Sequence, residues 1–559
     1  IAFACYGGSA WAACPGTVTG TEAGCALGGN KSVTIDATGK LPFITVAAPG
    51  TGNITNAGVV GPTAATTAAI NYAGDLAGTL TNSGVIKNAR TGTTSVGVYI
   101  EDGLLGTLDN SGTIEAKSTN DYAYGVYIYA DDLEGTLTNT GRIAATATGT
   151  AWNTAVGIAI YGDNTGDLTG SLVNEGTIQG RATGSGGTGY GVYVEGELSG
   201  TLDNSGLIKG IVSSVDSGGS AYGVYLDGGI AATGKLMNSG TIEGVVDGGT
   251  SWGYAAGIIG EDDLAGELTN SGTIRGSRNG GSGGTGYGVY VEGELSGTLD
   301  NSGLIQGVVA PNDSGGSAYG VYLDDGIASS GKLLNSGTIE GKLDGGTTWG
   351  YAAGIIAEDD VDGTLTNTGK ISGHLVMKDV GATGPTVGGT VYGIYIHGAV
   401  NGTVDNSGTV EAFVSAYDGG TAYGLYAGPT DGDIINSGLI SARVIAGVDT
   451  DGTSGGGAAG VYLTDWDSSE AALSATASLV NSGTIQATLT GGTWGSVYGV
   501  FVGDDLDGSL DNSGTITASV TNKRSDFSVS RGDSVEASAY GIAVGSDVNG
   551  KLSNSGTVL

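Results

Sequence analysis

The sequence predicts an all-β fold, a single-stranded parallel β-solenoid of about sixteen coils with three short strands in each coil. The phrase G-T-L-x-N-S-G recurs mostly every 26 to 35 residues, with wider gaps of 39, 45 and 42, and repeats of this length are typical of solenoids. Each part of the phrase alternates apolar and polar residues, which indicates β-strands. The asparagine of the phrase occupies Asn56, Asn82, Asn110, Asn139, Asn174, Asn204, Asn238, Asn270, Asn301, Asn335, Asn367, Asn406, Asn436, Asn481, Asn512 and Asn554.

One coil, residues 106–128, shows the three expected strands in order. In the first strand Leu108 and Asn110 share a face, and the following Ser-Gly supplies a corner because glycine accepts a positive φ. The second strand begins at Thr113, and the third reads Tyr-Gly-Val-Tyr-Ile at 124–128. By alternation, Tyr124 is expected on the inward face, and Tyr127 points outward. In-register stacking predicts an inward ladder of the asparagines, with a structural role.

The repeat also predicts the organisation of the chain. Residues 1–50 precede the first regular phrases and are expected to form a cysteine-containing cap or assembly segment, followed by a solenoid domain over 51–559. Residues 185–274 match 282–371 at a constant offset of 97, which indicates that three coils were duplicated as a block. At the usual spacing of about 4.8 Å, sixteen coils make a rod roughly 75 Å long. No stretch shows a helical period with caps, so helical repeats are excluded.

Composition limits the partners. The formal net charge of −36 and the lack of a basic stripe argue against nucleic acid or anionic lipid as a partner. No apolar run reaches the roughly 18 residues that span a bilayer. The chain begins at Ile1 without a basic leader, which fits removal of a secretory signal. The only cysteines are the disulfide candidates Cys5, Cys14 and Cys25, which predict one disulfide and one further thiol, with three reduced cysteines as the alternative.

Two sets of outward residues are candidate sites. Acidic pairs at the corner after the third strand are candidates for Ca²⁺ because stacked carboxylates repel each other without a cation, and solvated turns are the alternative; they include Asp131, Asp132, Asp262, Asp263, Asp359 and Asp360. No other cofactor is indicated. An aromatic ridge predicts a contact surface for carbohydrate, a host protein or another rod, or a stack that stiffens the sheet. Its members are Tyr99, Tyr127, Tyr193, Tyr225, Tyr290, Tyr322, Tyr395, Tyr426 and Tyr462.

The repeated N-S-G-T-I units followed by Y-G-V/I-x-V/I resemble the passenger regions of bacterial autotransporters and related surface adhesins, over about residues 51–559. The resemblance implies a right-handed parallel β-helix exported to the cell surface. We therefore expect a non-enzymatic extracellular protein with a structural or adhesive role. The apolar N-terminal segment and the final phrase, which stops at Leu559, favour a filament joined end to end with other copies. A monomeric adhesin for host or matrix glycans is the alternative, and a polysaccharide-degrading enzyme the third.

Overall fold

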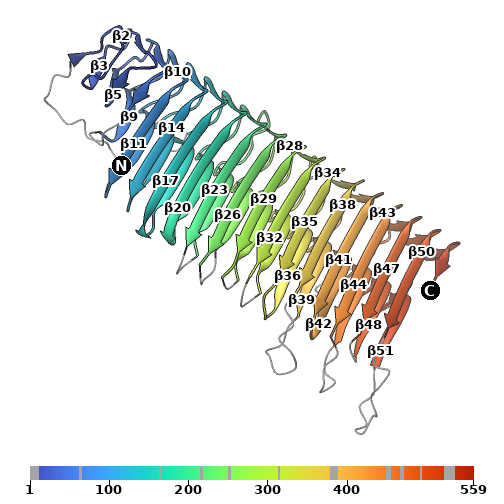
Figure 1. Ribbon diagram of the computed structural model, residues 1–559. Helices are drawn as coiled ribbons and strands as arrows, with labels where there is room; N and C mark the ends of the chain where they lie inside the picture. The colour runs from blue at the N-terminus through green and yellow to red at the C-terminus, as the bar shows by residue number, and fades with distance from the viewer. Residues whose placement is uncertain are drawn as a thin grey trace.

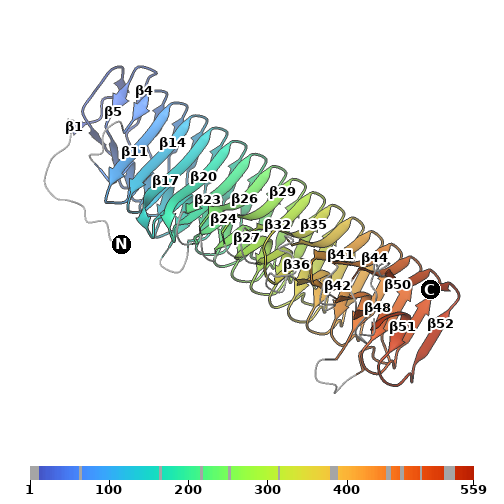
Figure 2. The ribbon, with the colours of Figure 1, turned by 60° about the horizontal axis from the view of Figure 1, so that its bottom comes forward.

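The chain forms a straight rod of stacked coils (Figures 1 and 2). The computed structural model describes residues 12–61, 66–162, 166–214, 218–249, 253–281, 283–311, 315–377, 388–447, 455–465, 471–491, 494–521 and 536–559. All regular structure in these ranges is β-strand, arranged as three parallel sheets of 18, 18 and 17 strands that run the length of the rod. The all-β parallel solenoid with three strands per coil is therefore confirmed. Within these ranges no helix is long and apolar enough to cross a membrane.

The first sheet, here called the asparagine sheet, holds the strand that ends at the asparagine of each phrase. Two strands precede the first phrase, so the sheet has 18 members for sixteen asparagines. They are β2 (Thr17–Val18), β4 (Val33–Ile35), β7 (Ile54–Asn56), β10 (Thr79–Asn82), β13 (Thr107–Asn110), β16 (Thr136–Asn139), β19 (Ser171–Asn174), β22 (Thr201–Asn204), β25 (Lys235–Asn238), β28 (Glu267–Asn270), β31 (Thr298–Asn301), β34 (Lys332–Asn335), β37 (Thr364–Asn367), β40 (Thr403–Asn406), β43 (Asp433–Asn436), β46 (Ser478–Asn481), β49 (Ser509–Asn512) and β52 (Lys551–Asn554).

The second sheet, the isoleucine sheet, starts after the Ser-Gly corner and carries a buried isoleucine or valine at its second position in most coils. Its strands are β5 (Lys40–Leu41), β8 (Val59–Val60), β11 (Val85–Thr91), β14 (Thr113–Thr119), β17 (Arg142–Ala151), β20 (Thr177–Ser185), β23 (Leu207–Ser214), β26 (Thr241–Gly248), β29 (Thr273–Asn279), β32 (Leu304–Ala310), β35 (Thr338–Asp344), β38 (Lys370–Val376), β41 (Thr409–Ala416), β44 (Leu439–Ala446), β47 (Thr484–Thr490), β50 (Thr515–Thr521) and β53 (Thr557–Val558).

The third sheet, the tyrosine sheet, closes each coil. Its strands are β1 (Ala12–Ala13), β3 (Cys25–Leu27), β6 (Ile44–Ala47), β9 (Ala68–Ala73), β12 (Ser95–Ile100), β15 (Ala123–Tyr129), β18 (Thr154–Tyr161), β21 (Thr188–Val194), β24 (Ser220–Leu226), β27 (Tyr254–Gly260), β30 (Thr285–Val291), β33 (Ser317–Leu323), β36 (Gly350–Ala357), β39 (Gly389–Ile396), β42 (Gly419–Ala427), β45 (Gly455–Leu463), β48 (Trp494–Val502) and β51 (Glu536–Val544). An additional column of isolated bridges, such as Leu104 to Leu133, lines the corner between this sheet and the next asparagine strand.

The asparagines stack in register from Asn56 to Asn554. Each side-chain Nδ2 donates to the Oδ1 of the next asparagine at 2.7–2.8 Å, which makes fifteen consecutive bonds. In most coils the same Nδ2 also donates to a backbone carbonyl of the next coil, as Asn301 does to the carbonyl oxygen of Thr338 at 3.1 Å. The ladder therefore satisfies buried amides that the core would otherwise leave without partners.

The core between the sheets is apolar and continuous along the rod. Leu108, Ile114, Val126 and Ile128 of one coil are fully buried, and their counterparts in the other coils join the same cluster. Parallel sheets that bury one face against each other explain why these positions repeat so strictly.

The strands before residue 50 belong to the same sheets. β3 pairs with β6, β6 pairs with β9, and β4 pairs with β7, so the ladders cross the domain boundary expected at residue 50 without interruption. Cys14 and Cys25 form a disulfide and lie 11 positions apart in the sequence. Cys5 lies outside the described residues.

Candidate binding surface

The Tyr-Gly-Val-Tyr segment departs from simple alternation at its glycine. In β15 the ladder to β18 passes from Tyr124 to Val126 and leaves Gly125 unpaired in register. A Cβ built on Gly125 would lie 2.7 Å from Cγ2 of Ile143, so the glycine faces the core and has no room for a side chain. Because Gly125 and Val126 both lie inward, Tyr124 and Tyr127 both lie outward. The inward placement of Tyr124 expected from the sequence is therefore wrong, and the physical reason is this local irregularity.

The outer face consequently carries two parallel tyrosine columns. The second column contains the ridge residues expected from the sequence, and the first column consists of the tyrosines that precede the glycine. The first column comprises Tyr124, Tyr190, Tyr222, Tyr287, Tyr319, Tyr392, Tyr423, Tyr498 and Tyr540; the second comprises Tyr99, Tyr127, Tyr193, Tyr225, Tyr290, Tyr322, Tyr395, Tyr426, Tyr462 and Phe501.

The rings of both columns pack on one another. Centroids of successive rings lie 5.2 Å apart for Tyr190–Tyr222 and 5.0 Å apart for Tyr426–Tyr462. The two columns also touch, with 4.4 Å between the centroids of Tyr124 and Tyr127. Burial in the stack raises the pKa of Tyr290 to about 12. Most of the ring surface is therefore covered by neighbouring tyrosines. This favours a stack that stiffens the sheet over a ridge that is freely accessible to a partner.

Among the strands from β12 to β51, three lack rings in both columns. The two positions hold Val156 and Ala159 in β18, Ala256 and Ile259 in β27, and Ala353 and Ile356 in β36. All six residues are buried. In β18 the interruption is bridged by Tyr161, whose ring lies 6.1 Å from that of Tyr193.

The same three coils carry exposed aromatic side chains at another place, the corner where the isoleucine sheet passes into the tyrosine sheet. Trp152 immediately precedes β18, Tyr254 begins β27, and Trp349 and Tyr351 flank the start of β36. Trp494 extends the set at the start of β48. These five residues, here called the aromatic edge, have exposed fractions of 83% for Trp152, 50% for Tyr254, 46% for Trp349, 45% for Tyr351 and 56% for Trp494. Trp252, which the duplication relates to Trp349, lies outside the described residues.

Carboxylates follow the third strand of many coils, and one aspartate in several of them has a defined backbone partner. Asp132 Oδ1 accepts the backbone N–H of Asp167 at 2.9 Å, Asp263 Oδ1 that of Glu294 at 2.8 Å, and Asp360 Oδ1 that of Ala399 at 2.6 Å. These aspartates therefore join each corner to the next coil. Sequence reasoning missed this role, although an aspartate directly before a buried leucine or valine recurs at Asp75, Asp132, Asp167, Asp263, Asp360 and Asp505.

The calcium candidates divide between these two kinds of position. Asp132, Asp263 and Asp360 are the backbone-bonded aspartates, whereas Asp131 and Asp262 each accept the N–H of the next residue in the chain. Asp359 lies beside Asp360 in the corresponding corner. In the described part of the chain no group of three or more His, Cys, Asp or Glu side chains is arranged to hold a metal ion.

Acidic groups are densest beside the tyrosine columns at β21–β27. Asp167, Glu195, Glu197 and Asp227 line an open depression of about 440 Å³. The pKa of Asp227 is raised to about 6, first by burial and then by its hydrogen bond to and charge repulsion from Glu261. The Tyr225 hydroxyl donates to Glu261, and the Tyr322 hydroxyl donates to Glu358 at 3.1 Å in the duplicated block.

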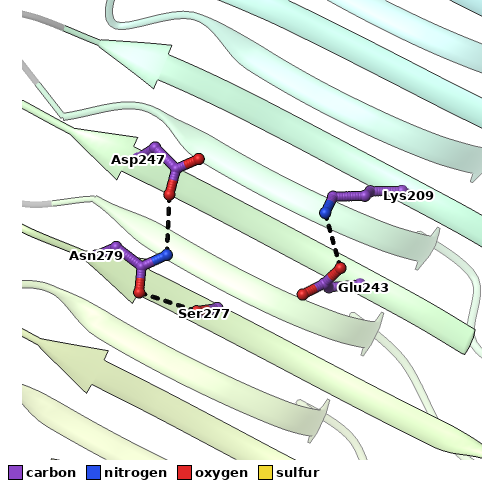
Figure 3. Close-up of polar contacts among 5 residues, drawn as sticks. All are labelled: Lys209, Glu243, Asp247, Ser277 and Asn279. Carbon is purple, nitrogen blue, oxygen red and sulfur yellow. Dashed lines mark hydrogen bonds and ion pairs between the residues drawn. The ribbon is translucent and has the colours of Figure 1, made fainter.

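The outer face of the isoleucine sheet carries a different pattern, in which polar side chains bond from coil to coil (Figure 3). The Lys209 Nζ lies 2.8 Å from Glu243 Oε2 in the neighbouring strand, and Asn279 Nδ2 donates to Asp247 Oδ1 at 2.8 Å. Such partly exposed ion pairs add little stability individually.

Comparison with protein-family profiles and with curated protein sequences gives no match to this chain.

Proposed function

We propose that this protein is a non-enzymatic, extracellular β-solenoid that acts as a stiff structural or adhesive rod. The observation that carries the proposal is the unbroken ladder of fifteen Asn–Asn hydrogen bonds between Asn56 and Asn554. A repeat array bends where contact between neighbouring units is weak. From Asn56 to Asn554 each pair of neighbouring coils shares three strand ladders and an inward amide bond, so stiffness is uniform over this part of the rod.

Two further observations support this role. The stacked tyrosine columns add axial contacts on the outer face, and the corner aspartates add hydrogen bonds between coils. The Cys14–Cys25 disulfide supports an oxidising compartment such as the cell exterior. The resemblance to autotransporter passengers and surface adhesins points in the same direction.

The proposal is tested by imaging and by adhesion. Negative-stain electron microscopy of the purified chain is expected to show straight rods of uniform length, and beads coated with it are expected to adhere to surfaces covered with extracellular matrix proteins or cell-wall polysaccharides. Rods that bend at random positions, or beads that bind none of these surfaces, would overturn the proposal. A dilution series on the same grids tests the end-to-end filament, which stays a prediction because the N-terminal residues 1–11 lie outside the described part.

A further inference from the structure

The aromatic edge places large apolar side chains in solvent where burial does not explain them. Single exposed apolar residues are common on proteins, but tryptophan has a large apolar surface and is enriched where proteins bind partners. Trp152 is 83% exposed, and its backbone has a φ of +43°, in the left-handed region that residues other than glycine seldom adopt. Such conformations persist where the surroundings enforce them and are concentrated at functional positions. Neither burial of the side chain nor the backbone preference of tryptophan explains why position 152 holds a tryptophan.

Two of the indole rings, those of Trp152 and Trp349, rest on glycines of the next coil. A Cβ built on Gly186 would lie 3.5 Å from Cδ2 of Trp152, and one built on Gly388 would lie 2.9 Å from Cζ3 of Trp349. The glycine backbone therefore serves as a support on which the ring lies, and a larger residue at Gly388 would displace it. A ring supported from below and exposed above offers a flat apolar platform of fixed orientation.

Three of the platforms, Trp152, Tyr254 and Trp349, are evenly spaced, and Trp494 lies four coils beyond Trp349. β18 is followed by β21, β24 and β27, and β27 by β30, β33 and β36, so Trp152, Tyr254 and Trp349 lie at the same corner at intervals of three coils. At about 4.8 Å per coil this interval is about 14 Å. These are also the coils in which both tyrosine columns are interrupted. In each of them the aromatic group lies at the edge instead of in the stack.

We propose that the aromatic edge binds a linear, uncharged polysaccharide that lies along the rod and stacks its sugar rings on these platforms. This inference deepens the proposed adhesive function and rests on it. The apolar face of a pyranose ring matches an indole or phenol ring, and a polymer with a regular repeat matches separate platforms at a regular interval. A folded protein partner would instead favour one contiguous apolar patch. The net charge of −36 disfavours acidic polysaccharides, so the polymer is uncharged.

The test uses the full chain and native-gel affinity electrophoresis with cellulose derivatives, soluble β-glucan or glycol chitin in the gel, and alginate as the acidic counterpart. The unmodified rod is expected to be retarded by at least one uncharged polymer and not by alginate. The triple variant Trp152→Ala, Tyr254→Ala, Trp349→Ala is expected to bind about tenfold or more weakly, from the loss of three stacking contacts. Tyr540→Ala is the matched control because that ring is 47% exposed but lies in the first tyrosine column.

The outcomes separate this inference from the proposed function. Equal retardation of the triple variant and the unmodified rod would overturn the inference, as would binding to alginate alone. Rods that adhere to matrix proteins but to no polysaccharide would also overturn it and would leave the adhesive rod standing. Circular dichroism and electron microscopy of the triple variant show whether the rod is intact. If it is not, Trp152→Phe and Trp349→Phe keep flat rings in place and are expected to retain most of the binding.

Discussion

Substitution of Asn301 by alanine tests the asparagine ladder at the middle of the rod. Asn301 Nδ2 donates to Asn335 Oδ1 at 2.8 Å and to the Thr338 carbonyl oxygen at 3.1 Å, and its own Oδ1 accepts from Asn270 at 2.7 Å. In Asn301→Ala, Asn335 Oδ1 and the Thr338 carbonyl oxygen lose this donor. The Gly303 carbonyl oxygen, which Asn301 Nδ2 also reaches at 3.3 Å, keeps the N–H of Thr338, and Asn270 Nδ2 keeps the Leu304 carbonyl oxygen at 3.1 Å. At about 1–3 kcal/mol for each buried group left without a partner, the expected loss is about 4 kcal/mol.

The loss is expected to be local because each coil contacts only its neighbours. Hydrogen exchange measured by mass spectrometry gives the opening free energy of peptides that cover β28, β31 and β34, with β46 and β49 as a distant reference. Asp300→Ala in the same strand removes an outward side chain and is expected to change the opening free energy by about 0.5 kcal/mol or less. Equal loss of protection in the two variants would refute the reasoning.

A second variant separates the hydrogen bond from the cavity. Asn301→Asp keeps the size of the side chain but replaces the Nδ2 donor by an acceptor that faces Asn335 Oδ1. We expect Asn301→Asp to be at least as destabilising as Asn301→Ala at pH 7 and less destabilising at low pH, where the protonated carboxyl can donate again. If packing alone mattered, Asn301→Asp would be tolerated at both pH values.

Three further changes have defined outcomes. Gly320→Ala is expected to destabilise its coils by about 1–3 kcal/mol by overpacking, because the new Cβ would lie 2.6 Å from Cγ2 of Ile339. Chemical denaturation measures this loss of stability, and an unchanged free energy of unfolding would contradict the close approach. Reduction of Cys14–Cys25 is expected to remove up to about 3 kcal/mol from the first coils, measured by proteolysis with and without reductant. Because the folded pKa of Asp227 is raised to about 6 from 3.8, its favourable contribution is complete below pH 4 and is lost as the pH rises to 6. Asp227→Asn should therefore stabilise the rod at pH 7 by about 1 kcal/mol, after allowance for solvent screening, and leave it unchanged at pH 4; melting curves at both pH values decide.

The fold could be predicted because the same residues carry both the strand pattern and the repeat. Leu108 and Asn110 mark the first strand of a coil, and their spacing to Ile114 hardly varies between coils. The early strands β2 and β4 escaped prediction because they lack the asparagine phrase, although they bury Val18 and Ile35 in the same core. Coils stack in a solenoid when their backbones have the same shape. The asparagine phrase is the most regular sequence that forms this shape, but it is not required for it.

The binding surface was harder to predict because alternation fails at one residue. Counting by two assigned Tyr124 to the core, whereas the inward Gly125 and Val126 place both tyrosines outside. The signal was present in the sequence: seven coils contain two tyrosines at a spacing of three with a glycine directly after the first. The roles of the acidic corners were also not visible, since the hydrogen bond that the backbone N–H of Asp167 donates to Asp132 Oδ1 joins residues 35 apart.

The interruptions in the tyrosine columns are placed so that the remaining tyrosines keep stacking partners. A ring inside a column is covered by its neighbours. The coils of β18, β27 and β36 carry their exposed aromatic residues at the edge and none in the columns, whereas β48 carries Trp494 at the edge and keeps Tyr498 and Phe501 in the columns. If two adjacent coils lacked their column tyrosines, the next tyrosine would have no stacking partner on that side. It could then lose the partner on its other side as well. The interruptions at β18, β27 and β36 are instead separated by pairs of tyrosine coils, β21 with β24 and β30 with β33. Tyr193 therefore still packs on Tyr225 at 5.5 Å, and Tyr290 on Tyr322 at 5.4 Å. An interval of three coils is the shortest that leaves every such tyrosine one stacking partner in an adjacent coil, and the duplicated unit has this length.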